Sequence, residues 1–112
     1  MCWFRKKKPQ AVFEDTTLFL EEYAGNIKSL LNYTKENEEV SREINRVKEA
    51  YIYAVAPKIT NKKVQQCKDN IKTMYEDLKK VLRSGEWDEK DVMFRLADLK
   101  SELESLTAVT QK

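Results

Sequence analysis

The chain has 112 residues, of which 41% are hydrophobic and 36% charged, and its formal net charge is +2. This length suits one domain, and the charged fraction exceeds the roughly one quarter that is usual in globular domains. A charge so near neutrality argues against a dedicated nucleic-acid-binding protein, which is broadly basic. The chain has only 2 glycines and 2 prolines, fewer than the turns of a β or α/β fold require, so the composition predicts helices.

We expect residues 1–13 to form a basic, flexible leader and residues 14–112 to form a single helical domain. Either Asp15 or Thr16 can cap the start of the first helix. Apolar residues then recur at steps of three and four, as on one face of a helix. Gly25 lies inside this pattern and weakens a helix by about 1 kcal/mol relative to alanine. It therefore indicates a close contact between helices.

A second helix is predicted after the polar stretch 34–39, with Asn37 as its cap. Its apolar face holds Val40, Ile44, Val47, Tyr51 and Ala54. The stretch 50–56 is apolar on all sides, and such a helix is buried from several directions. This stretch is expected to lie centrally in the fold or in a contact between protein chains.

Pro57 lacks an N–H group and predicts a break or a kink after this helix. Thr60 and Asn61 could then cap a new helix. The apolar spacing nevertheless stays in phase across the proline, at Ala54, Pro57, Asn61, Val64, Cys67, Ile71, Met74, Leu78 and Val81. Two architectures follow. Either four helices alternate in direction, or residues 37–84 form one long kinked helix that favours a dimer.

The boundary before the last helix is the clearest in the sequence. Gly85 suits the left-handed residue that ends a helix, and Asp88 suits the cap of the next one. Trp87 and Val92 flank that cap at the spacing of a hydrophobic staple. The last apolar face is Val92, Leu96, Leu99, Leu103 and Leu106. The fold class is therefore predicted to be all-α, an antiparallel bundle of three to four amphipathic helices.

The predicted core joins the apolar faces of these helices. Its residues are Leu20, Tyr23, Ile27, Leu30, Ile44, Val47, Tyr51, Val64, Cys67, Ile71, Leu78, Leu96, Leu99 and Leu103.

Residues with catalytic potential are scarce. The chain has no histidine, which is the commonest general base and metal ligand, and its two glycines cannot form a phosphate-binding loop. Two cysteines are too few for a zinc site, and Cys67 lies in the apolar pattern as a small buried hydrophobe. The sequence thus predicts a protein that is not an enzyme and binds no cofactor, metal or small-molecule substrate.

The leading hypothesis is an interaction protein that self-associates or binds a helical protein partner, because 50–56 is apolar on all sides. The predicted interface consists of Tyr51, Ile52, Tyr53 and Val55.

A second hypothesis is a peripheral membrane adaptor, because aromatic residues precede a run of four bases near the start of the chain. The membrane-contact residues would be Trp3, Phe4, Arg5, Lys6, Lys7 and Lys8. No apolar run of signal-peptide length follows them, so we expect a cytoplasmic location, with attachment to a membrane surface as the variant.

A third hypothesis is a nucleic-acid-binding bundle that uses Lys58–Lys72, a stretch with five lysines and one acid. The acidic stretch 86–104 holds seven acids and three bases, so pairing between the two helices is the simpler explanation.

Overall fold

The computed structural model describes residues 16–58 and 61–109. In that part of the chain it contains the α-helices α2 (Thr16–Ser29), α3 (Glu38–Tyr53), α4 (Lys62–Ser84) and α5 (Glu89–Thr107), and the short 3-10 helix η2 (Leu30–Tyr33). They pack into a bundle without strands among these residues, which confirms the predicted all-α class. The predicted leader lies outside the described residues.

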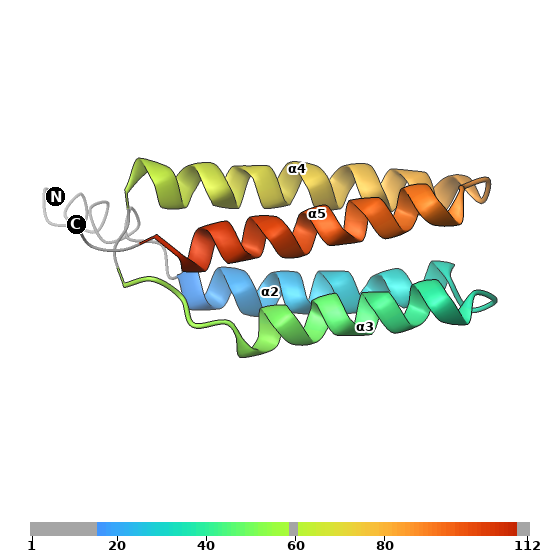
Figure 1. The fold of residues 1–112 in the computed structure, drawn as a ribbon, viewed down its shortest axis with the longest axis horizontal. Helices are drawn as coiled ribbons and strands as arrows, with labels where there is room; N and C mark the ends of the chain where they lie inside the picture. The colour runs from blue at the N-terminus through green and yellow to red at the C-terminus, as the bar shows by residue number, and fades with distance from the viewer. Residues whose placement is uncertain (1–15, 59–60, 110–112) are drawn as a thin grey trace, which may run out of the picture.

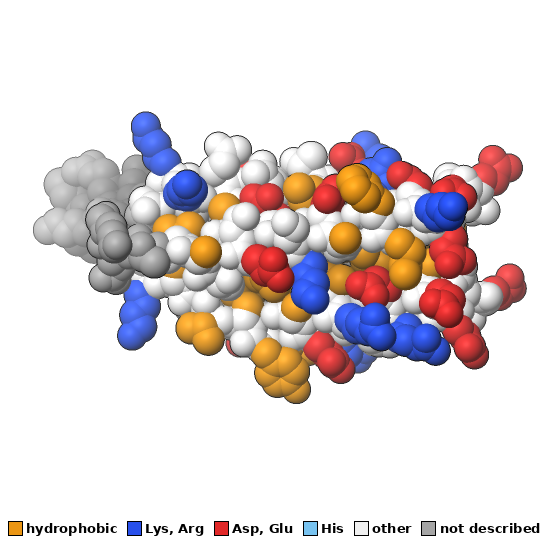
Figure 2. All heavy atoms as spheres, in the orientation of Figure 1, with side chains coloured by type: hydrophobic (Ala, Val, Ile, Leu, Met, Phe, Trp, Pro, Cys, Tyr) orange, Lys and Arg blue, Asp and Glu red, His pale blue; other side chains and the backbone are white. Residues whose placement is uncertain are grey.

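Successive helices alternate in direction and form two hairpins, α2–α3 and α4–α5 (Figure 1). The hairpins meet where α3 packs beside α5, and these two helices run in the same direction (Figure 1). On the other side, the ring of Tyr23 on α2 meets the ring of Tyr75 on α4 edge-on, with 5.5 Å between their centroids. The segment after α3 therefore carries the chain from one hairpin to the other. Charged side chains cover much of the visible outer surface (Figure 2).

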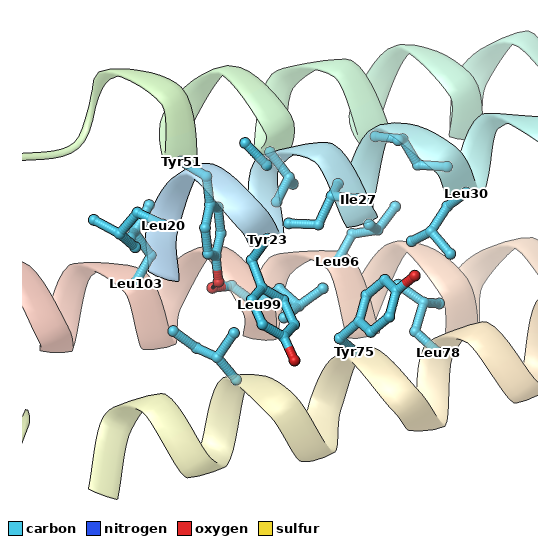
Figure 3. Packing of buried hydrophobic residues seen from close by; sticks show 14 of the residues in the cluster. Leu20, Tyr23, Ile27, Leu30, Tyr51, Tyr75, Leu78, Leu96, Leu99 and Leu103 are labelled. Carbon is cyan, nitrogen blue, oxygen red and sulfur yellow. Dashed lines mark hydrogen bonds between the residues drawn. The ribbon is translucent and has the colours of Figure 1, made fainter. Parts of the chain in front are cut away.

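All the predicted core residues are buried, and they form one cluster that extends along the bundle (Figure 3). The cluster also contains Phe19 and Tyr75, which the spacing argument left out. Phe19 packs on Tyr23 with 4.8 Å between the ring centroids. The α2 face is thus wider than a strict three-and-four spacing predicts.

Local capping chemistry explains where the helices begin and end. The side chains of Asn37, Asn61 and Asp88 accept hydrogen bonds from the backbone N–H groups three residues later. Each bond satisfies an amide that has no partner inside its own helix. Gly85 ends α4 with φ of +78°, the left-handed conformation predicted for it. The break between α2 and α3 is also confirmed, with η2 tightening the last turn before it.

The structure decides the question at Pro57 in favour of a break. Helix α3 ends at Tyr53, and Ala54 is already extended with ψ of 144°. A proline removes the N–H that would bond to the carbonyl four residues earlier, and its ring clashes with that carbonyl. For Pro57 that carbonyl belongs to Tyr53, the last residue of the helix. The alternative of one long kinked helix over 37–84 is therefore wrong, and so is the expectation that 54–56 are helical.

Candidate interaction surface

The predicted interface residues divide into one buried and three exposed side chains. Tyr51 is only 1% exposed and packs in the core, so its assignment to a surface interface is corrected. By contrast, the exposed fractions are 50% for Ile52, 78% for Tyr53 and 79% for Val55. We call these three residues the α3-end surface. Hydrophobic side chains protrude along the edge of the molecule that α3 forms (Figure 2).

The geometry of the end of α3 explains why Tyr51 is buried while the α3-end surface is exposed. The helix directs Tyr51 inward because that position continues the spacing of Val40, Ile44 and Val47. The next two positions then point away from the core, and Val55 follows in non-helical chain after the helix has stopped. Proline at position 57 thus helps to expose Val55. In a continued helix, Val55 would lie one turn after Tyr51 on the inner face.

Two hollows adjoin the α3-end surface, one on each side. The first, of about 590 Å³, lies between the end of α3 and α5 and has Val55, Pro57 and Leu103 in its wall. The second, of about 340 Å³, lies between α2 and α3. It is lined by Glu21, Ala24, Gly25, Lys28, Lys48 and Ile52. The exposed apolar residues are therefore flanked by concave surface on both sides of α3, toward α2 and toward α5.

A third hollow, of about 530 Å³, lies at the opposite end of the bundle, between the α2–α3 and α4–α5 connections. Tyr33, Trp87 and Glu89 lie in its wall, and Asn37 donates a hydrogen bond of 3.1 Å to Glu89 across it. Acidic side chains are frequent at this end (Figure 2). The N-termini of α3 and α5 both start here, and acids in a first turn offset the positive end of a helix dipole. Helix stability accounts for these acids.

Burial raises the pKa values of two groups near the centre of the bundle, the Tyr51 hydroxyl and the Cys67 thiol. Burial raises the pKa of the Tyr51 hydroxyl far above its usual value, and the nearby Glu102 carboxylate adds to the effect. Burial also raises the pKa of the Cys67 thiol, with a further contribution from Glu102. A raised pKa leaves little thiolate at neutral pH, so Cys67 is a poor nucleophile. In residues 16–58 and 61–109, no three His, Cys, Asp or Glu side chains are grouped so as to hold a metal ion.

The basic stretch Lys58–Lys72 is not a continuous exposed strip. Lys68 is 0% exposed, and its Nζ lies 5.5 Å from the centroid of the Phe19 ring. Lys68 is therefore not part of an exposed basic surface that nucleic acid could contact, and its inclusion in the predicted stretch is wrong. It lies four residues after Val64 and three before Ile71, so the core spacing itself places it on the inner face. Lys58, Lys62, Lys63 and Lys72 are exposed.

The predicted membrane contacts, residues 3–8, lie outside the described part of the chain, and their role stays a prediction. None of the helices that the structure describes is both long and apolar enough to cross a bilayer.

The sequence argument missed Gly25 and Lys48 as lining residues of a groove, although it singled out Gly25 as a helix-weakening position.

No protein-family model matches the chain, and neither the curated proteins nor the solved structures contain a match to it.

Proposed function

We propose that the protein is a non-enzymatic helical interaction protein that acts through the α3-end surface, by self-association or by binding a helical protein partner. The observation that supports this proposal is the exposure of Ile52, Tyr53 and Val55 next to one another, at 50%, 78% and 79%. Isolated exposed apolar residues are ordinary, but three of them within four positions of the chain, beside concave surface, are typical of protein contacts. Tyrosine is also enriched at the centres of interfaces.

The chemistry of the described residues supports an interaction role over a catalytic one. The only described cysteine is buried with a raised pKa, and burial also raises the pKa values of Tyr23 and Tyr51. Burying the α3-end surface against a partner would remove apolar area from water at about 25 cal/mol per Å². The surface thus offers binding energy, whereas the one described thiol is a poor nucleophile.

Site-specific photo-crosslinking tests the proposal. A benzoylphenylalanine in place of Tyr53 should give a discrete covalent adduct in cells that make the protein, of twice the chain mass for self-association or another fixed mass for a partner. The matched control carries the same photoreactive residue in place of Thr73, an exposed position on α4. Adduct formation from position 53 should fall sharply in a Val55→Lys background. Equal labelling from both positions, or none from position 53, would contradict the proposal.

A further inference from the structure

Gly25 is a helix-interior glycine without a structural requirement among the described residues. A Cβ added at this position would meet no heavy atom within 4 Å, so close packing inside the molecule does not demand a glycine. Its φ is not positive either, since Gly85 is the described glycine with that conformation. Glycine weakens a helix relative to alanine, and its lack of a side chain allows another backbone to approach closely. The lack of a side chain at Gly25 therefore leaves an open space that no described residue occupies.

That surface is the groove between α2 and α3. Ala24 and Gly25 lie beside each other in its wall, with Ile52 on α3 opposite them. Ala24 is buried, whereas Ile52 is half exposed and belongs to the α3-end surface. Small residues on one side and a protruding isoleucine on the other make the groove wide enough, at about 340 Å³, for apolar side chains of another helix.

The groove is lined by one acid, Glu21, and two bases, Lys28 and Lys48, and the two charges on α2 are complementary to those of a second copy in the reverse direction. Glu21 lies four residues before Gly25 and Lys28 lies three after it, and both line the groove. Seven residues of helix separate them by about 10.5 Å, too far for an ion pair within one chain. A two-fold axis through Gly25, perpendicular to α2, would place the acid of each copy opposite the base of the other. A parallel arrangement would instead bring like charges together.

We propose that the occupant of this groove is a second copy of this chain, docked as a symmetric dimer in which the two α2 helices cross antiparallel at Gly25. Each ion pair then forms twice, as a two-fold contact requires. The partner helix covers Ile52 at the rim of the groove, so the dimer extends the α3-end surface. The inference rests on the proposed interaction function and names its partner.

Substitution of Gly25 separates docking from folding. In light scattering after size exclusion over a concentration series, the wild-type chain should form a dimer. Gly25→Gln should weaken its dissociation constant by at least about tenfold, because the side chain fills the groove. The same variant should keep or raise the melting temperature at low concentration, because the position is open and glutamine favours helix. Thr73→Gln, an exposed change on α4, should leave the dimer intact.

Charge exchange tests the ion pairs across the dimer and their orientation. Glu21→Lys alone and Lys28→Glu alone should each weaken the dimer, because each places like charges opposite one another. Mixing the two variants should restore association as a mixed dimer, because both cross-contacts again join opposite charges. An intramolecular effect cannot produce this rescue, since the two substitutions are then on different chains. A mixture that associates no better than the separate variants would overturn the ion pairs across the dimer. A chain that carries Glu21→Lys and Lys28→Glu together should also recover the dimer, because only the antiparallel geometry then pairs opposite charges, and its failure to do so would overturn that geometry.

The outcomes distinguish the inference from the proposed function. A wild-type chain that is monomeric at every concentration, together with a discrete partner adduct from position 53, would overturn the dimer and leave the interaction function standing. A dimer that tolerates Gly25→Gln but is lost on Tyr53→Ser and Val55→Ser would show self-association through another face, and would again overturn the inference.

Discussion

The hydroxyl of Tyr51 on α3 donates a hydrogen bond of 2.8 Å to the backbone carbonyl oxygen of Leu99 on α5, and the two residues lie side by side in the core (Figure 3). They are 48 positions apart in the chain. The bond joins the two hairpins at the helix pair that runs in the same direction. A buried phenol needs such a partner, because an unsatisfied hydroxyl in an apolar core costs free energy.

Tyr51→Phe should therefore lower the free energy of unfolding by about 1 kcal/mol, since the ring remains in place and the hydrogen bond to Leu99 is lost. Urea denaturation followed by circular dichroism measures this change. Tyr53→Phe is the matched control, because Tyr53 is 78% exposed and should change stability by less than about 0.5 kcal/mol. Equal effects at the two positions would mean that the bond does not contribute.

Stability should fall at alkaline pH. Burial raises the pKa values of Tyr51 and Tyr23 above the ordinary 10.0, and that of Cys67 above 9.0. Above these ordinary values the unfolded chain releases protons that the folded chain retains, so each further pH unit favours unfolding. The contribution of these groups is complete below about pH 8 and is lost progressively above pH 9 to 10. Urea midpoints at pH 8 and pH 10.5 test the sign, and Tyr51→Phe should reduce the difference. A urea midpoint that is the same at pH 8 and pH 10.5 would refute the predicted loss of stability at alkaline pH.

Cys67 should react slowly with thiol reagents in the folded protein. Its side chain is buried and its pKa is raised, so both access and thiolate content are low. The measurement uses a Cys2→Ser background with a chromogenic disulfide at pH 8, so that Cys67 is the thiol observed. The reaction should become fast in urea. Rapid labelling without denaturant would show that the α4 face opens.

Alanine at the two glycines should have opposite effects on stability. Gly25→Ala should raise the free energy of unfolding of the monomer by about 0.5 to 1 kcal/mol, because the added Cβ meets open space in a helix. Gly85→Ala should lower it by about 1 kcal/mol, because φ of +78° is strained for an L side chain. Thermal melts at low protein concentration compare the two. A gain at position 85 would contradict the left-handed cap.

The predicted core was recovered from spacing because helical burial imposes a period that survives in the sequence. Lys68 shows the limit of this reasoning, since its position follows the period while its charge suggests solvent. The charge of Lys68 predicts exposure and its position in the helix predicts burial, and in the structure the side chain is buried. Phe19 was missed for a related reason, because the buried face of α2 is broader than one line of contacts.

The candidate surface was only partly predictable. An apolar stretch at 50–56 pointed to the right segment, but the inner face of α3 and the place where the helix stops together determined which residues are exposed. Tyr51 is core and Val55 is surface because the helix ends between them. The groove beside Gly25 had no signal in the sequence beyond the glycine itself, since its other wall comes from α3.

By itself, the sequence determined the helices, their caps and their apolar faces, because these depend on neighbours within a few residues. It also determined the absence of histidine chemistry. Only the tertiary structure decided that the helix ends before Pro57 and that α3 lies beside α5. It also decided that Tyr51 is buried while Ile52, Tyr53 and Val55 remain exposed. An apolar spacing that stays in phase fits a bend and a break equally well, and the packing of residues far apart in the chain selects between them.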